Sequence, residues 1–248
     1  MKEKITIAID AMSGENSPSK NIRGLSIFLT KNSRKDDFFF NLYGDEKLIN
    51  VELKKNKISL DNIKIFDSKS VVSDNETPLT AIKTSKNTSM WNSINSQIID
   101  SSDISLSAGN TGVLLVISRM LLKTLENVSK PALAGLWPSK KGMSVVLDLG
   151  ANIECDEKNM VEFAELGAAL YKSLFPKKTP NVGLLNIGTE DYKGTNVVKK
   201  AFINLKEISK KSDFEFNGYI EANKITDGKT NVIIADGFTG NIALKTAE

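Results

Sequence analysis

Short runs of β-branched and aromatic residues alternate with longer amphipathic segments along the chain, and this alternation constrains the fold more than any other feature. Each short run has the length of a strand, and each longer segment has the apolar spacing of a helix with one buried face. Strands joined through helices pair mostly in parallel, and the helices cover both faces of the sheet. The pattern therefore predicts an α/β fold with three layers, α/β/α, around a mostly parallel sheet.

The individual elements can be placed from this periodicity. The predicted strands are 5–9, 38–43, 63–66, 104–107, 144–147, 182–185 and 231–235, with further strands at 132–136 and 214–220. The predicted helices are 17–31, 78–99, 111–124, 158–175, 195–209 and 239–247. A length of 248 residues suits one large domain or two small ones. Because no repeat or low-complexity linker divides the chain, we expect a single domain over 1–248.

Five predicted strands end in loops rich in small, hydroxyl, amide and acidic residues. These loops are Asp10–Glu15, Ser107–Gly112, Asp148–Asn152, Asn186–Glu190 and Asp236–Asn241. Each loop alone is as typical of an ordinary turn between a strand and a helix. The carboxyl ends of parallel strands form one edge of a sheet, where ligands bind in such folds. Five such loops on the edge of a single sheet therefore predict a binding site.

Two of these loops have the layout of an anion site. Gly109–Gly112 and Gly237–Asn241 each open a predicted helix, whose first N–H groups and dipole favour a negative charge. Lys193 follows the loop at 186–190 and could neutralise that charge. A small anion such as phosphate is the ligand that this pattern favours.

Missing residue types exclude several kinds of catalysis. The chain has no histidine and a single cysteine, Cys155. Ser-His-Asp and Cys-His catalysis, HExxH zinc sites and CxxC sites are therefore impossible. Cys155 is interpreted as a small buried residue, because no suitable base could activate it. We expect no metal and no cofactor, and proton transfers that use carboxylates, lysines, hydroxyls or the substrate itself.

Nucleotide and nucleic-acid functions are also disfavoured. No two of the 16 glycines are separated by a single residue, so the GxGxxG motif is absent. Gly228-Lys229-Thr230 imitates the end of a phosphate-binding P-loop, but Asn223 stands where its first glycine belongs. The net charge of +3 is too small to predict nucleic-acid binding.

The sequence also bears on location. Apolar runs such as Val113–Ile117 are far shorter than the roughly 20 residues that span a bilayer. Met1–Lys4 leads directly into a predicted strand, without the apolar region of a signal peptide. We therefore expect a cytoplasmic protein.

Six segments resemble one known family. They are IAIDAMSGENSP (7–18), SAGNTG (107–112), KPALAGLWP (130–138), LDLGAN (147–152), VGLLNIGTEDYKG (182–194) and DGFTGNIALKTAE (236–248). In this order and length, they resemble the bacterial phosphate acyltransferases of phospholipid synthesis. The resemblance covers nearly the whole chain.

The resemblance implies an isopropylmalate-dehydrogenase-like fold and a homodimer. It implies the reversible transfer of a fatty acyl group from acyl-acyl-carrier protein to inorganic phosphate. The acyl phosphate would then pass to a membrane glycerol-3-phosphate acyltransferase. Such a reaction needs no histidine, because phosphate is already a nucleophile near neutral pH and a thiol with a pKa of about 8.5 can leave.

Candidate roles follow from the motif positions. We expect Lys193, Asn110, Asp10 and Asn186 to act in catalysis, with Lys193 supplying positive charge. The candidates for binding substrate or phosphate are Gly14, Gly109, Thr111, Gly112, Asn152, Gly188, Thr239, Gly240 and Asn241.

The chain departs from the family pattern at several positions. Ser13 and Glu15 replace a glycine and an aspartate of the first loop, and Asn87 replaces an aspartate that follows a lysine. Ala222 and Lys224 interrupt a segment that usually resembles EGRDI. Ser13 could crowd a close backbone approach, and Lys224 reverses a charge. These changes bear on substrate detail more than on family membership.

Family members also continue beyond the position of Glu248, with an apolar hairpin implicated in dimerisation and in peripheral association with the membrane. We expect both properties to be weaker without it.

Three alternatives remain open. A phosphotransacylase that uses acyl-CoA would suit the same sheet and anion site. An inactive shortened chain with a binding or scaffold role would retain the fold without turnover. A metal-dependent decarboxylating dehydrogenase would share the fold, but the missing nucleotide motifs argue against it.

Overall fold

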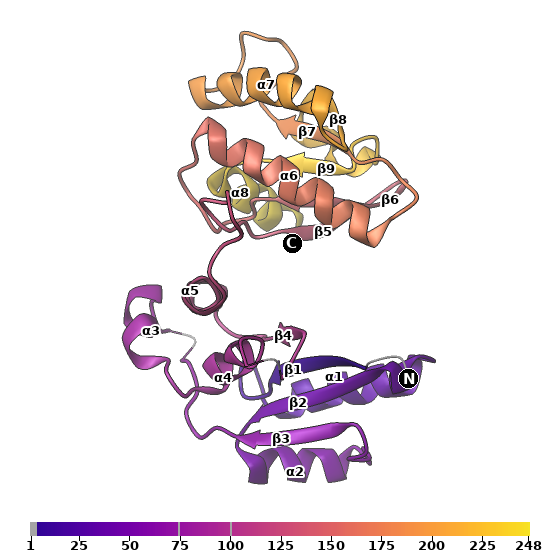
Figure 1. Cartoon of the computed structure of the whole chain (residues 1–248), viewed down its shortest axis with the longest axis vertical. Helices are drawn as coiled ribbons and strands as arrows, with labels where there is room; N and C mark the ends of the chain where they lie inside the picture. The colour runs from indigo at the N-terminus through magenta and orange to yellow at the C-terminus, as the bar shows by residue number, and fades with distance from the viewer. Residues whose placement is uncertain (1–3, 74, 100) are drawn as a thin grey trace. The chain divides into compact units, whose positions relative to one another are not determined.

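A computed structural model describes residues 4–73, 75–99 and 101–248. The start of the chain, Met1–Glu3, on which the expected location depends, lies outside the described residues. The chain divides into two compact units, Met1–Lys123 and Thr124–Glu248. Each unit contains its own sheet (Figure 1). Whether the two units form the single domain expected over 1–248 stays a prediction.

The first unit alternates strands and helices. Its elements are β1 (Ile5–Asp10), α1 (Ser19–Lys31), η1 (Lys35–Asp37), β2 (Phe38–Gly44), α2 (Glu46–Lys55), β3 (Ile63–Asp67), α3 (Pro78–Thr84), α4 (Ser89–Asn95), β4 (Ile104–Leu106) and α5 (Thr111–Leu122). The strands pair in the order β3-β2-β1-β4, and all three pairings are parallel.

Helices cover both faces of this first sheet. Ile22 of α1 and Ile49 of α2 pack with Phe40 and Leu42 of β2. On the other side, α4 contacts β1 and β2. A second apolar cluster joins α3, α4 and α5 through residues such as Met90.

The second unit contains the longer helices. Its elements are β5 (Gly135–Ser139), β6 (Gly142–Leu147), α6 (Glu157–Leu174), β7 (Asn181–Leu185), α7 (Asn196–Ile208), η2 (Ser209–Lys211), β8 (Glu215–Ile220), η3 (Ala222–Asp227), β9 (Val232–Ile234) and α8 (Gly237–Ala247). The strand order is β5-β6-β9-β7-β8, and only the β5–β6 pairing is antiparallel. Pro138 lies in β5 at the edge of this sheet, where a strand residue without an N–H is tolerated.

The second sheet is likewise the middle of three layers. The odd-numbered residues Val145 and Leu147 of β6 face the core that contains Phe163 of α6 and Leu205 of α7. The neighbouring Val146 faces the opposite core, which includes residues of α8. Figure 1 shows α6 and α7 together over the sheet, with α8 behind it. This alternation is the period of two that a strand imposes on its side chains.

The predicted fold class is confirmed, but one part of the expected topology is wrong. The described strands form two sheets, so the five loops do not share one edge of a single sheet. Two loops follow strands of the first sheet, and three follow strands of the second. Hydrophobic periodicity identifies a strand but does not encode which strand it pairs with.

Two details of the helices also differ from prediction. Helix α2 was not predicted, although Asp45 caps it by accepting from the amides of Lys47 and Leu48. The segment predicted as one helix over 78–99 is two, α3 and α4. Asn87 between them has φ 68°, which a helix cannot contain, and Thr88 then caps α4. None of the helices in the described part of the chain is long and apolar enough to cross a membrane.

Candidate functional site

In the first unit, Asp10 holds the loop after β1 against the loop after β4. Its side chain is 1% exposed, and its Oδ2 accepts a hydrogen bond of 2.8 Å from Ser107 Oγ. Ser13 Oγ lies 2.9 Å from the same hydroxyl and accepts from the amide of Ala108 at 3.2 Å. The predicted catalytic residue Asp10 is therefore a buried group that organises the two loops.

Gly14 and Gly109 are predicted ligand contacts for which the structure gives a packing reason. Gly14 has φ +82°, and a Cβ there would lie 2.9 Å from Ala108 Cβ. A Cβ on Gly109 would lie 3.0 Å from Ser13 Cβ. The crowding expected of Ser13 is thus accommodated by hydrogen bonds and by a neighbouring glycine.

The loop 107–112 opens helix α5, as predicted. Asn110 caps the helix: its Oδ1 accepts from the amide of Val113 at 3.1 Å, and its Nδ2 donates to the carbonyl of Glu76 at 3.2 Å. Thr111 and Gly112 lie in the first turn, whose amides the helix itself does not use. This end of α5 can therefore present N–H groups to an anion.

In the second unit, Asp148 is the centre of the loop after β6. Its fully buried carboxylate accepts five hydrogen bonds, from the amides of Leu133, Gly150, Ala151 and Asn152 and from Asn152 Nδ2. Asn152 Nδ2 also donates to the carbonyl of Pro131 at 2.7 Å. The predicted binding residue Asn152 thus connects the loop 148–152 to the segment before β5.

The start of α8 packs directly on that loop. The amide of Gly237 donates to the carbonyl of Asn152 at 2.8 Å, and Asn241 Nδ2 donates to the carbonyl of Leu149 at 3.2 Å. A Cβ on Gly240 would overlap the carbonyl oxygen of Asp148. The structure therefore brings Asn152, Gly240 and Asn241 together, and their role in binding substrate stays a prediction.

Asp236 caps α8 and also accepts a hydrogen bond from the side chain of Thr239. Its Oδ1 accepts from the amide of Thr239 at 2.7 Å, and its Oδ2 accepts from Thr239 Oγ1 at 3.0 Å. The predicted binding residue Thr239 is thus committed to the cap.

The loop after β7 carries Asn186 and Lys193. Asn186 Oδ1 accepts from the amide of Ile187 at 2.9 Å, and its Nδ2 donates to the carbonyl of Lys193 at 3.2 Å. Lys193 Nζ lies 2.9 Å from Glu190 Oε1, and the lysine side chain is 34% exposed. Its hydrogen bond and charge hold the pKa of Glu190 below the ordinary value. A Cβ on Gly188 would lie 2.7 Å from Lys193 Nζ, so the glycine leaves room for the lysine side chain.

The other departures from the family pattern lie on the surface or at a turn. Glu15 forms an exposed ion pair with Lys20 at 3.0 Å. Lys224 lies 3.9 Å from Asp227 and is largely exposed. Neither change removes a group from the loop contacts described above.

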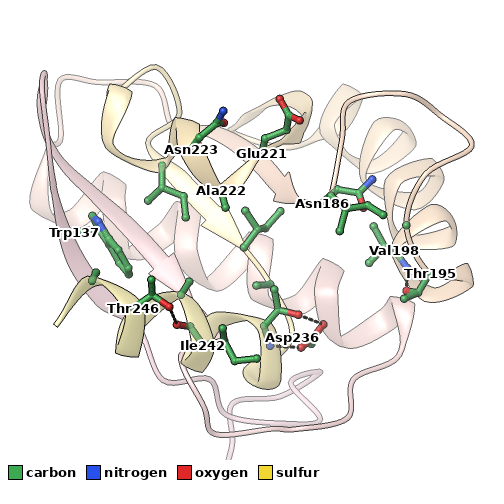
Figure 2. A pocket seen from close by; sticks show the side chains of 18 of the residues that line it. Trp137, Asn186, Thr195, Val198, Glu221, Ala222, Asn223, Asp236, Ile242 and Thr246 are labelled. Atoms are coloured by element: carbon green, nitrogen blue, oxygen red, sulfur yellow. Dashed lines mark hydrogen bonds between the residues drawn. The ribbon is translucent and has the colours of Figure 1, made fainter.

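Sequence reasoning did not find a large pocket beside these loops. The pocket has a volume of ≈ 850 Å³, and Figure 2 shows its lining residues, which include Trp137, Asn186, Asp236 and Ile242. Its lining residues come from several elements, among them β5, the loop after β7, η3 and α8. No single segment of the sequence therefore predicts it. Ile242 directly follows the loop 236–241, but only the structure shows that this side chain is exposed.

No group of three or more cysteine or acidic side chains among residues 4–73, 75–99 and 101–248 is placed to hold a metal ion. Cys155 is partly buried, and burial raises the pKa of its thiol. It donates weakly to the carbonyl of Asn152 at 3.5 Å, so it supports the loop 148–152.

Nearly the whole chain matches one family of known proteins. A family model described as "Fatty acid synthesis protein" matches residues 5–248. A phosphate acyltransferase from Pelagibacter ubique is 49% identical over 248 residues, which are 100% of this chain and 73% of that protein. The chain belongs to the phosphate acyltransferase family. A second phosphate acyltransferase, from Caulobacter vibrioides, is 38% identical and is covered over 68% of its length, again by the whole of this chain.

Solved structures support the fold of this family member. A phosphotransacetylase from Streptococcus pyogenes matches with a TM-score of 0.71 at 14% identity, over 98% of this chain and 81% of that chain. EutD phosphotransacetylase from Staphylococcus aureus matches with a TM-score of 0.69 at 16% identity, with the same coverage. At such identities the likeness concerns the α/β fold alone. The fold also matches a putative 4-hydroxythreonine-4-phosphate dehydrogenase from Salmonella typhimurium, with a TM-score of 0.56 at 9% identity. This match covers 98% of this chain and 85% of that chain.

Proposed function

We propose that the chain transfers a fatty acyl group from acyl-acyl-carrier protein to inorganic phosphate and so makes acyl phosphate for phospholipid synthesis. The observation that carries this proposal is the 49% identity to a phosphate acyltransferase over the whole chain. Features of each unit, taken separately, are compatible with it: the first turn of α5 in the first unit and the ammonium of Lys193 in the second unit each favour an anion.

The proposed chemistry is a single displacement at a thioester. A phosphate oxygen attacks the carbonyl carbon, and the carbonyl oxygen gains negative charge. The C–S bond then breaks, and the carrier leaves as a thiolate that takes up a proton. Catalysis requires alignment of the two substrates and stabilisation of the developing charge, both of which preorganised N–H groups and an ammonium provide.

We propose that Lys193 binds the phosphate. In the structure its partner is Glu190, an exposed carboxylate with a lowered pKa. Phosphate would replace that carboxylate as the partner of the ammonium. Asn186 would then position Lys193, since its Nδ2 holds the Lys193 carbonyl. Asp10 and Asn110 would support the loops of the first unit, where Thr111 and Gly112 offer amides.

The partners of the reaction are also proposals. The family resemblance supports a homodimer and delivery of acyl phosphate to a membrane glycerol-3-phosphate acyltransferase. Sedimentation equilibrium would give the mass of the assembly, and a monomer at micromolar concentration would contradict the dimer.

The direct test measures release of the carrier thiol from palmitoyl-acyl-carrier protein, with and without phosphate. Hydroxylamine traps any acyl phosphate that forms. We expect phosphate-dependent release with trapped product, whereas release without phosphate would contradict the proposal. Palmitoyl-CoA in a parallel reaction separates a carrier-protein enzyme from a phosphotransacylase that uses CoA.

Lys193→Met tests the proposed phosphate ligand. We expect turnover to fall by about 100-fold or more, the usual effect of losing one electrostatic donor from such a site. Lys172→Met is the matched control, because Lys172 forms a similar ion pair, 2.8 Å from Asp213, and is 49% exposed. Equal activity of the two variants would remove Lys193 from the site.

A further inference from the structure

The pocket of ≈ 850 Å³ lies wholly within the second unit and next to the loops that carry Asn186 and Asp236. Leu185 of β7 and Ala235 line it from the sheet, Ile225 of η3 forms one wall and Ile242 of α8 the other. Figure 2 shows η3 and α8 on opposite sides of the opening. Its volume is in the range of a site built for an organic ligand.

Different residues line the two ends of the pocket. Trp137 and Thr246 lie at one end in Figure 2, and Asn186, Thr195 and Val198 lie at the other. The apolar walls continue between the two ends, where Ile242 is 52% exposed. An isoleucine that lines a pocket and remains half exposed offers apolar surface that a ligand can cover.

The charges of the pocket exclude an anionic occupant. Among the described residues that line it, none is a lysine or arginine, and the charged ones are Glu221 and Asp236. Asp236 is occupied as the cap of α8. The described lining therefore offers a phosphate no cationic side chain, whereas a neutral hydrocarbon chain is not repelled by the two carboxylates.

We propose that this pocket binds the hydrocarbon chain of the fatty acyl donor, with the thioester near Asn186 and the terminal methyl group near Trp137. This inference rests on the proposed function, because that function supplies a neutral acyl thioester. The Asn186 end adjoins Gly194 and hence Lys193, the proposed phosphate ligand. The arrangement would place the thioester carbonyl next to the phosphate and the tail away from it.

A hydrocarbon site makes affinity depend on chain length. Each buried methylene contributes about a fourfold gain in affinity. The dependence should level off where the chain reaches Trp137, and Trp137 itself should report the contact. The chain has two tryptophans, so Trp91→Phe leaves Trp137 as the single reporter.

The test uses S-alkyl pantetheine thioethers, which mimic the donor and cannot react. Octyl, dodecyl and hexadecyl thioethers are titrated into the Trp91→Phe protein, and Trp137 fluorescence gives each Kd. We expect tighter binding with each increase in length and a blue shift with the longest chain. Affinity that does not change with length would overturn the proposal.

Thr246→Phe, made in the same background, shortens the pocket at its Trp137 end. We expect hexadecyl binding to weaken by about tenfold or more, the loss of two methylenes, while octyl binding is unchanged. Thr179→Phe is the matched control, because Thr179 is exposed and is not among the residues that line the pocket. An equal loss in both variants would contradict the proposal.

A second variant guards against a folding defect. Ile242→Ser changes the wall of the pocket at an exposed position, and we expect about tenfold weaker hexadecyl binding with an unchanged circular dichroism spectrum. Unchanged hexadecyl binding in this variant would also overturn the proposal.

The acyl-transfer assay separates this inference from the proposed function. Length-dependent binding without phosphate-dependent thiol release would leave the pocket assigned and refute the reaction. The converse outcome is phosphate-dependent thiol release with the same acyl-length preference in Thr246→Phe and in the unmodified protein. That result would support the reaction and refute the pocket as the acyl-chain site.

Discussion

The carboxylate of Glu190 depends on the ammonium of Lys193, whose Nζ lies 2.9 Å from Glu190 Oε1. The hydrogen bond from Lys193 is the main reason that the pKa of Glu190 is lowered. A lowered carboxylate pKa in the folded state means that the pair stabilises the loop at pH values above the unfolded-state pKa. This stabilisation is lost as the pH falls through the folded-state pKa of Glu190.

Lys193→Met should therefore raise the pKa of Glu190 toward its ordinary value, while the backbone hydrogen bonds to this carboxylate keep part of the lowering. The carboxyl carbon resonance of Glu190, followed by NMR between pH 2 and pH 7, measures the change. Lys172→Met should leave Glu190 unaffected and raise the pKa of Asp213, which Lys172 lowers in the same way. A Glu190 titration that is the same in all three proteins would show that the pair does not form in solution.

The two aspartates Asp10 and Asp148 show where prediction from sequence stops. Their positions at strand ends were predicted correctly, and both lie in loops that meet other loops. Nothing in the sequence indicates that each carboxylate points inward, because an acid at a strand end is equally compatible with an open ligand site. Burial and five N–H donors distinguish the structural role of Asp148, and these depend on tertiary contacts.

At the scale of elements, most boundaries follow from the sequence because capping and strand signals are local. Asp156 caps α6 by accepting from the amide of Asn159. Helix α2 was not predicted although it has an amphipathic pattern, with Ile49 and Leu53 on its buried face and Asp45 as its cap. The break between α3 and α4 was not predicted, although the polar run at 84–89 contains the residue of positive φ, Asn87, and the cap of α4, Thr88.

The packing of α8 on the loop 148–152 can be tested by adding one methyl group. Gly240→Ala places a Cβ against the carbonyl oxygen of Asp148, so either the helix or the loop must shift. We expect the free energy of unfolding to fall by about 1–3 kcal/mol, with loss of phosphate-dependent turnover. Urea unfolding and the thiol-release assay measure the two effects.

Gly24→Ala is the matched control, because Gly24 lies within α1 and a Cβ there meets nothing within 4 Å. Alanine is the better helix former, so this change should stabilise the chain by about 0.5–1 kcal/mol. The same substitution thus has opposite signs at the two positions. Stabilisation by both changes would mean that α8 does not rest on the loop as described.

At the scale of the molecule, each unit contains its own apolar cores. Phe163 is fully buried between α6 and the second sheet, and Phe40 is 2% exposed between the first sheet and α1 and α2. Sequence periodicity predicted that both phenylalanines lie in elements of an α/β fold. It could not assign them to different cores, because that depends on which strands pair. The pocket was not predicted for the same reason, since its walls come from several segments that are separate in the sequence.

Separate cores imply that a cavity in one unit acts on that unit first. Phe163→Ala should cost about 3–5 kcal/mol and speed amide hydrogen exchange in β6, β7 and β9 by roughly a hundredfold or more, with little change in β1 and β2. Phe40→Ala should produce the reverse pattern. Native-state exchange read by mass spectrometry resolves the two sets of strands. If either substitution accelerated exchange equally in both sets, the chain would open as one cooperative unit, and the two cores would contribute to a single stability rather than to two.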